Sequence, residues 1–167
     1  MKRFLKTSFV FLTIFVYFVA GGCFKKQNTY SNYGMSITMD KGFEEKDVFG
    51  YTYYLQSTDS MMAAAKEEFD GTILTSETTL EEYTRLVLKA NNYYYTQSTR
   101  DDKYNYFTFS KTVSGKRHFY VATIHKADGA LWLIQFGCNE SDKDEFEEKF
   151  LKWADTVTFE SNSEENV

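Results

Sequence analysis

The chain has 167 residues and a net charge of −5 at pH 7, with 24 acidic side chains against 19 Lys and Arg. An acidic surface repels phosphate backbones, which argues against nucleic-acid binding. Aromatic residues make up 19% of the chain, including 16 Phe and 13 Tyr, so stability is expected to come from a packed hydrophobic core.

The first 22 residues have the layout of an export signal. Met1–Lys6 carries the three cations Lys2, Arg3 and Lys6, and the uncharged run Phe9–Ala20 of 12 residues follows. This run is shorter than the roughly 20 apolar residues that a permanent membrane-spanning helix needs. A charged segment followed by a short apolar one is typical of a secretory signal.

Three small residues, Ala20, Gly21 and Gly22, precede Cys23. This arrangement resembles the bacterial lipobox, whose cysteine thiol is joined to diacylglycerol before cleavage. The resemblance implies that Cys23 is the lipid attachment site; an ordinary secretory cleavage after the glycines is the alternative. Two or three acyl chains anchor firmly, since each buried methylene contributes about 0.8 kcal/mol. We therefore expect an extracytoplasmic lipoprotein, lipid-anchored to the cell membrane.

The predicted domain organisation is simple. A signal peptide over 1–22 is followed by a lipidated polar tether over 23–33, a single domain over 34–160 and an acidic, disordered tail over 161–167. Removing the signal peptide leaves a net charge of −8, because 16 Lys and Arg then face 24 Asp and Glu. With Cys23 lipidated, one thiol remains and no disulfide can form within the chain.

The first half of the domain alternates in the period of strands. Apolar side chains alternate over Met35–Met39, and again over Phe49–Ser57, where Phe49, Tyr51, Tyr53 and Leu55 share one face. Met61–Phe69 has the composition of a helix former, but it follows a tight turn closely enough to be the return strand of a hairpin. We favour the strand and leave the helix open.

A helix is predicted next, because Thr78–Glu82 contains a capping box and apolar residues then recur at helical spacing to about Ala90. Three strands follow, separated by short glycine-containing breaks that favour an antiparallel meander; they cover Tyr104–Val113, Arg117–Lys126 and Ala130–Cys138.

The last of these strands is apolar on both faces, with Leu131 and Leu133 on one and Trp132, Ile134, Phe136 and Cys138 on the other. Layers are therefore expected on both sides of the sheet. A final helix begins near Ser141 with the apolar stripe Phe146, Phe150, Trp153, Ala154 and Val157, and a short strand around Val157–Phe159 closes the fold.

Four segments together resemble PsbP-like domains, namely Gly34–Phe43, Leu80–Tyr83, Leu131–Phe136 and Phe150–Phe159. These domains occur in an extrinsic photosystem II protein, a eukaryotic Ran-binding protein and many bacterial lipoproteins. The resemblance implies an α+β fold, an antiparallel β-sheet with helices on both faces in an α/β/α sandwich. It also implies a partner-binding rather than a catalytic protein, and it transfers no functional residue beyond Cys23.

No catalytic, cofactor or metal motif is found. His118 and His125 are seven residues apart on one predicted strand, so they lie on opposite faces and cannot share a metal. The carboxylates of 142–148 lack the glycine and spacing of a calcium loop. Asp101 and Asp102 are interpreted as a solvated turn, and Cys138 as a small buried hydrophobe.

Tyr93, Tyr94 and Tyr95 are the candidate binding surface, since three consecutive tyrosines cannot all point into a core. A segment that covers the sheet edge is the alternative. The leading hypothesis is a non-enzymatic lipoprotein that binds a protein partner. A binder of small molecules or cell-wall glycans is the second, and a deep aromatic pocket would favour it. A hydrolase would require convergent titratable groups in one cleft.

Overall fold

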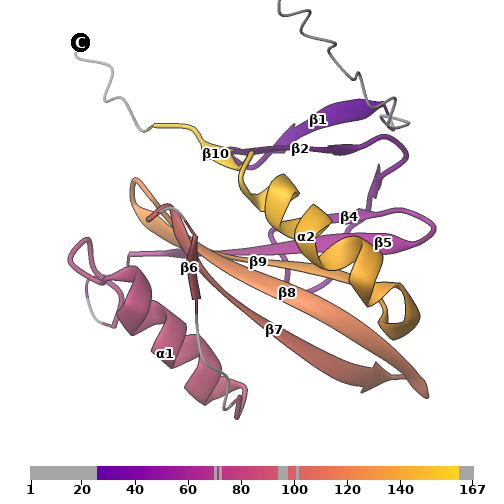
Figure 1. Cartoon of the computed structure of the whole chain (residues 1–167). Coiled ribbons are helices and arrows are strands. Elements are labelled where there is room, and N and C mark those ends of the chain that lie inside the picture. The colour runs from indigo at the N-terminus through magenta and orange to yellow at the C-terminus, as the bar shows by residue number, and fades with distance from the viewer. Residues whose placement is uncertain (1–25, 70, 72, 94–97, 101, 162–167) are drawn as a thin grey trace, which may run out of the picture.

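The computed structural model describes residues 26–69, 71, 73–93, 98–100 and 102–161 (Figure 1). The predicted signal peptide and Cys23 lie outside the described residues, as do Tyr94, Tyr95, Asp101 and all but the first residue of the predicted tail.

Two helices and ten strands follow one another along the described chain. In order they are β1 (Gln27–Asn32), β2 (Met35–Asp40), β3 (Glu44–Glu45), β4 (Tyr53–Gln56), β5 (Ser60–Glu68), α1 (Leu80–Ala90), β6 (Ser98–Arg100), β7 (Tyr104–Val113), β8 (Lys116–Ala127), β9 (Ala130–Asn139), α2 (Lys143–Ala154) and β10 (Thr158–Phe159). A single 3-10 turn, Glu140–Asp142, leads into α2.

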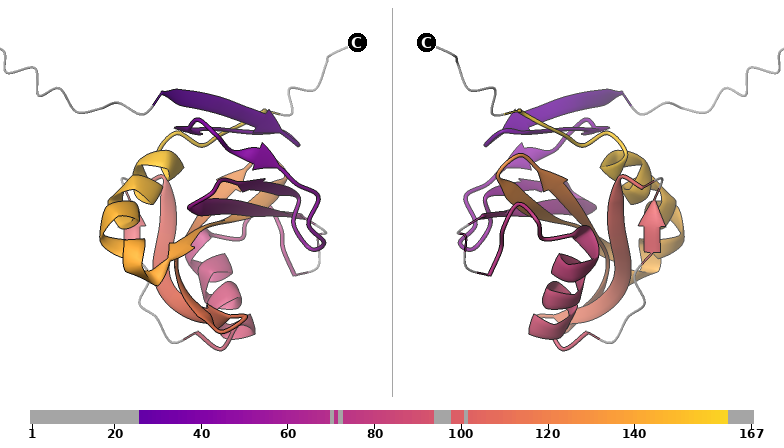
Figure 2. Two further views of the ribbon diagram at one scale, coloured as in Figure 1. Left: turned by 90° about the vertical axis from the view of Figure 1, so that its right-hand side faces the viewer. Right: turned by 90° about the vertical axis from the view of Figure 1, so that its left-hand side faces the viewer.

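The strands form two antiparallel sheets. The large sheet has seven strands in the order β3-β4-β5-β9-β8-β7-β6, and the small sheet has three in the order β1-β2-β10. Helices α1 and α2 lie on opposite sides of the large sheet, and the small sheet lies on the α2 side (Figures 1 and 2). The α+β class, with helices on both faces of an antiparallel sheet, is therefore confirmed.

The alternation of β9 divides the core in two. Trp132, Ile134 and Phe136 face α2 and pack with its aromatic stripe and with β2, whereas Leu131 faces α1 and packs with Tyr83 of that helix. All five of these side chains are at most 2% exposed. Burial on both faces explains why β9 is apolar from Ala130 to Ile134, as an inner strand of a covered sheet must be.

The expected strand at 61–69 is confirmed: β5 pairs with β4 on one side and with β9 on the other. The predicted capping box also forms, because Thr79 Oγ1 accepts from the Glu82 amide at 3.1 Å and a Glu82 carboxylate oxygen accepts from the Thr79 amide at 2.9 Å. These bonds satisfy amides that a helix start leaves free.

The prediction of a tether through residue 33 is wrong for 27–32. This segment is β1, which pairs with β2 from Gln27↔Asp40 to Asn32↔Met35. The strand has no apolar alternation in the sequence, because it is an outer strand with mostly exposed side chains. Backbone pairing holds it in place, together with the Tyr30 hydroxyl, which donates to the Asp40 carbonyl at 3.1 Å.

The prediction of one continuous strand over 49–57 is also wrong in its first half. Only Tyr53–Gln56 is a strand, whereas Phe49 is fully exposed and Tyr51 is 39% exposed. Gly50 has a φ of +89°, a conformation that breaks an extended segment and that glycine adopts without strain. Val157, placed by the sequence in the last helix, follows the end of α2 and is partly buried.

Candidate functional site

The surface of the large sheet beyond the end of α1 is concave, because small residues lie between aromatic ones on this face. One row across the sheet runs from Tyr54 through Ala63, Gln135 and Ala122 to Phe107. The alanines on either side of Gln135 are small, while aromatic rings stand at both ends of the row. Since α1 ends at Ala90, a depression remains on this face of the sheet.

The adjacent row has the same form. Met61, Gly137, Tyr120 and Phe109 lie next to one another on four neighbouring strands. Gly137 has no side chain, and the Tyr120 ring lies over it: a Cβ at Gly137 would stand 2.7 Å from the Tyr120 Cε1. The missing side chain therefore lets Tyr120 lie low against the sheet.

The resulting cavity, which we call the tyrosine basin, has a volume of about 370 Å³. It is bounded by the loop before β4, by the strands of the large sheet and by the last turn of α1 with the residues after it. Its lining residues are Val48, Tyr51, Tyr54, Met61, Val87, Asn91, Tyr93, Phe107, Phe109, Lys111, Val113, Tyr120, Leu133 and Gln135. Cavities of this size and aromatic character are typical of small-molecule sites.

Ring contacts fix the wall on the β7 and β8 side. Phe109 and Tyr120 stack at a centroid distance of 4.9 Å with 13° between their planes, and Tyr93 packs on Phe109 at 4.7 Å. On the opposite side of the basin, the ring centroids of Tyr51 and Tyr54 are 5.9 Å apart. Rings held by such neighbours present defined flat faces to the cavity.

The phenols of Tyr54 and Tyr120 remain neutral at physiological pH. Burial raises the pKa of Tyr120, and the nearby hydroxyls of Tyr51, Tyr54 and Tyr93 raise it further. Burial likewise raises the pKa of Tyr54, with a smaller contribution from Tyr51. Each neutral phenol both donates and accepts hydrogen bonds, so the basin combines flat apolar faces with polar groups.

Tyr93 is the member of the predicted tyrosine surface that the structure describes, and it lines the basin. The other tyrosines of the basin were not foreseen as site residues. The sequence pattern predicts Tyr51 on one face of a regular strand, and Tyr54 and Tyr120 are ordinary strand residues in the sequence. The only sequence signal for the basin was the unusual density of tyrosine.

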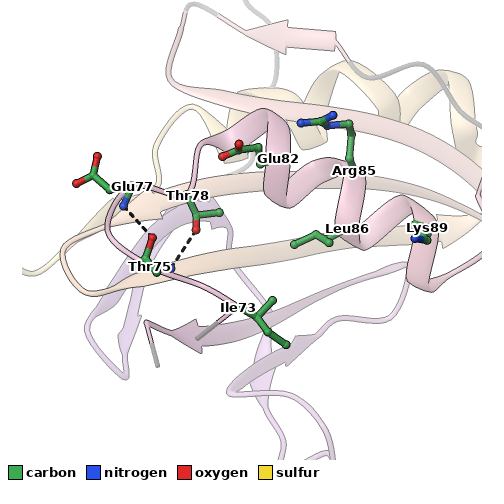
Figure 3. A pocket seen from close by; sticks show the side chains of 8 residues that line it. All are labelled: Ile73, Thr75, Glu77, Thr78, Glu82, Arg85, Leu86 and Lys89. Atoms are coloured by element: carbon green, nitrogen blue, oxygen red, sulfur yellow. Dashed lines mark hydrogen bonds between the residues drawn. The ribbon is translucent and has the colours of Figure 1, made fainter. Parts of the chain in front are cut away.

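A second concavity lies between α1 and the loop that precedes it (Figure 3). It is a broad, open groove of about 610 Å³, lined by Ile73, Thr75, Glu77, Thr78, Glu82, Arg85, Leu86 and Lys89. Ile73 is 73% exposed and Leu86 is 43% exposed. We call this surface the α1 groove; its openness suits a contact with another surface better than the enclosure of a small molecule.

A part-buried polar cluster lies on the α2 side of the sheet. Arg100 donates from Nε to Asp155 Oδ1 at 2.9 Å and from Nη2 to Oδ2 at 2.8 Å, and the Tyr104 hydroxyl donates to Oδ1 at 2.9 Å. The Tyr104 ring packs against His125 at a centroid distance of 4.7 Å, with 33° between the two planes. The cluster thus ties β6 and β7 to the end of α2.

The charges of this cluster are fixed near neutral pH. The bonds from Arg100 lower the pKa of Asp155, while burial raises the pKa of Tyr104. Burial lowers the pKa of His125 to about 3, against a smaller opposing effect of Asp155. Acid–base catalysis favours groups that titrate near the working pH. In this cluster all three pKa values are shifted away from neutral pH. The arrangement therefore favours a structural role for the cluster.

The remaining candidates from the sequence lie apart. His118 is half-buried near Tyr120, whereas His125 is 5% exposed on the opposite face. Cys138 is 3% exposed, and burial raises its pKa to about 12, so its interpretation as a small buried hydrophobe is confirmed. Asp102 has a φ of +55° in a turn. Among the described residues, no group of three or more His, Cys, Asp or Glu is placed to hold a metal.

Within the described part of the chain, neither helix has the length and apolar composition needed to span a membrane.

No family model matches the sequence, and no curated protein matches it. Solved structures do match. The cyanobacterial PsbP of Synechocystis is 13% identical with a TM-score of 0.50, over 81% of this chain and 94% of that one. The Ran-binding protein Mog1p of Saccharomyces cerevisiae is 6% identical with a TM-score of 0.57, over 83% of this chain and 98% of that one.

A third match is a protein of Bacteroides thetaiotaomicron, 11% identical with a TM-score of 0.53; it covers 78% of this chain and 47% of that one. The chain thus spans about half of that protein. Together with the first two matches, it gives the chain the PsbP-like fold, in agreement with the resemblance seen in the sequence.

Proposed function

We propose that this chain is a non-enzymatic binding protein, held outside the cell membrane by a lipid on Cys23, and that it binds a small ligand in the tyrosine basin. The observation that carries the proposal is the basin itself: about 370 Å³ bordered by four tyrosines, two phenylalanines and the end of α1. A concave site with aromatic walls and a few polar groups is the usual form of a ligand site.

The basin can be blocked without disturbing its walls. Gln135 is half-buried in the middle of the floor, between Ala63 and Ala122, so Gln135→Trp places a large side chain in the cavity. Lys152→Trp is the matched control, because Lys152 is exposed on α2 on the opposite side of the sheet. Both variants add an indole, but only one adds it in the basin.

The test uses protein purified in detergent and an extract of the cell envelope divided by dialysis into small and large solutes. A ligand that binds only the native state raises the unfolding temperature. We expect the small-solute fraction to stabilise the wild type and Lys152→Trp but not Gln135→Trp. Equal stabilisation of all three proteins, or of none, would contradict the proposal.

A protein partner is the second candidate, and the α1 groove favours it. Ile73 and Leu86 expose apolar surface on the two sides of the groove, beside the cations Arg85 and Lys89 (Figure 3). Apolar residues surrounded by polar ones are typical of protein contact sites. The Ran-binding protein with the same fold is consistent with this candidate.

Pull-down from membrane extract separates the two surfaces. Leu86→Ser should abolish capture of a protein that docks in the groove, whereas Tyr93→Ser should abolish capture of one that inserts a side chain into the basin. Capture that both variants retain, or no capture by the wild type, would remove the protein partner from consideration.

The anchor is supported by the sequence around Cys23. Intact mass of the membrane-extracted protein should show a chain that begins at Cys23 with added acylglycerol mass. Cys23→Ala should lack this mass and leave the membrane fraction. An unmodified wild-type chain would indicate ordinary secretion instead.

A further inference from the structure

We infer that the ligand of the tyrosine basin is a small, flat-ringed molecule that carries a carboxylate, with the ring between the aromatic walls and the carboxylate at Lys111. This inference rests on the proposed function of the basin and names the class of molecule that it takes. It follows from the shape of the walls, the charge of the lining and the polar groups on the floor.

The walls favour a ring. Phe109 and Tyr120 lie nearly parallel, with 13° between their planes, and Tyr93 is tilted by 34° from Phe109. Tyr51 and Tyr54 face them from the loop and β4. Rings gain most from partners that stack flat or meet them edge-on at centroid distances of about 4.5–7 Å. A flat ring meets both conditions, whereas a flexible aliphatic chain meets neither.

The lining favours a negative charge. Lys111 is the one charged side chain among the described lining residues, and none of these residues is acidic. Lys111 forms no ion pair with any described residue. A cation without an ion pair beside an aromatic cavity is free to bind an anionic group of a ligand.

The neighbouring strand adds to this charge. Residue pairing places Lys111 opposite His118, and Val113 opposite Lys116. Because alternate residues of a strand share a face, Lys116 lies on the same face of β8 as His118 and Tyr120. Arg117, between them, points to the other face and lies 3.6 Å from Glu140. The rim of the basin at this hairpin is therefore cationic, which suits an anion.

The polar groups on the floor suit the ring substituents. The phenol of Tyr120 is held neutral by its raised pKa, so it does not repel an anion. The Asn91 amide nitrogen donates to the Val87 carbonyl at 2.9 Å, which leaves its oxygen as an acceptor. Gln135 contributes a second amide to the lining. A hydroxyl on the ring would therefore find partners.

The test compares probes that differ only in charge. 4-Hydroxybenzoate and 4-hydroxybenzamide share a ring and a hydroxyl, and both are titrated into the detergent-solubilised protein while backbone amides are followed by NMR. Glucuronate and glucose form a second pair, which distinguishes a carboxylate on an aromatic ring from one on a sugar ring. Lys111→Gln removes the cation, and Lys152→Gln on α2 is the control.

We expect 4-hydroxybenzoate to shift amides around Lys111, Asn91 and Gln135 and to bind at least tenfold more tightly than the benzamide. Lys111→Gln should abolish that preference and Lys152→Gln should keep it. If only glucuronate bound more tightly than its neutral partner glucose, the ligand would still carry a carboxylate, but on a sugar ring instead of an aromatic one.

Equal binding of charged and neutral probes in the basin would overturn the inference while leaving the proposed binding function intact. Shifts confined to residues outside the basin, or binding unaffected by Gln135→Trp, would overturn both the inference and the assignment of the basin as the site.

Discussion

Gly137 lies directly beneath the ring of Tyr120, so that a Cβ at Gly137 would stand 2.7 Å from Cε1 and 2.9 Å from Cδ1 of that ring. The same Cβ would stand 3.0 Å from the sulfur of Met61. Real Cβ atoms essentially never make contacts as short as the two with the ring, and the contact with the sulfur would be tighter than most. Glycine is needed at position 137 because the Tyr120 ring occupies the volume that a larger side chain would take. The missing side chain thus lets Tyr120 form one wall of the basin.

Gly137→Ala should therefore lift Tyr120 from the sheet and disturb its stacking on Phe109. Overpacking of this kind costs about 1–3 kcal/mol of the free energy of unfolding, which chemical denaturation can measure. In a Tyr120→Ala background the added methyl group no longer contacts an aromatic ring. Gly137→Ala should therefore lower the free energy of unfolding much less in that background. An equal cost in both backgrounds would show that the contact with Tyr120 is not the reason for glycine.

Asp155→Asn should destabilise the fold by about 1–3 kcal/mol at pH 7, because it removes the negative charge and one of the two oxygens that accept from a part-buried Arg100. Because the pKa of Asp155 is lowered in the fold, its contribution is present above the ordinary aspartate pKa and is lost as the pH falls through the folded value. The difference between the two proteins should thus shrink in acid.

Glu68→Gln is the matched control for that experiment. Its pair with Lys66 has an equally short 2.9 Å contact, but the Glu68 side chain is 75% exposed. Water screens such a pair, so the urea midpoint should not change. A loss as large as that of Asp155→Asn would show that burial does not decide the strength of these ion pairs.

His125 should make stability depend on pH below neutrality. Burial lowers its pKa to about 3 in the fold, while the unfolded chain keeps a value near 6.5. Between these values the unfolded chain binds the extra proton, so stability is full above about pH 6.5 and falls toward pH 3 by up to ~1.4 kcal/mol per pH unit. His125→Gln should flatten this slope between pH 6.5 and 4.5; parallel profiles would show that His125 is not neutral in the fold.

Thr79→Ala should remove the cap of α1 and cost about 1 kcal/mol of stability. Its hydroxyl accepts from the Glu82 amide at 3.1 Å, and that amide has no partner within the helix. Thr79→Ser keeps the hydroxyl and should retain most of the stability, as measured by thermal unfolding. An equal loss in both variants would point to the methyl group instead of the cap.

The fold could be predicted well from the sequence where local patterns carry the information. The meander of β7, β8 and β9 follows from alternation and glycine breaks, and α1 follows from its capping box. β1 was missed because a polar outer strand has no apolar period, and its pairing with β2 is a tertiary effect. The strand that contains Tyr53 is shorter than predicted. Aromatic alternation continues into the preceding loop, where the positive φ of Gly50 breaks the extended backbone.

The tyrosine basin could not be predicted in the same way. It depends on the absence of large side chains at Ala63, Ala122 and Gly137, which come together only when β5, β9 and β8 pair in register. Tyr93 was singled out because three tyrosines in succession are conspicuous, whereas nothing local distinguishes Tyr54 or Tyr120 from the other aromatic residues of a sheet.

Native mass spectrometry of the protein released from its own membranes tests the central claim most directly. We predict a chain that carries acylglycerol mass on Cys23 and, in addition, a dissociable small ligand that is present with the wild type and Lys152→Trp but absent from Gln135→Trp. A wild-type protein without any bound ligand, or a ligand equally retained by Gln135→Trp, would contradict the assignment of the tyrosine basin as the binding site.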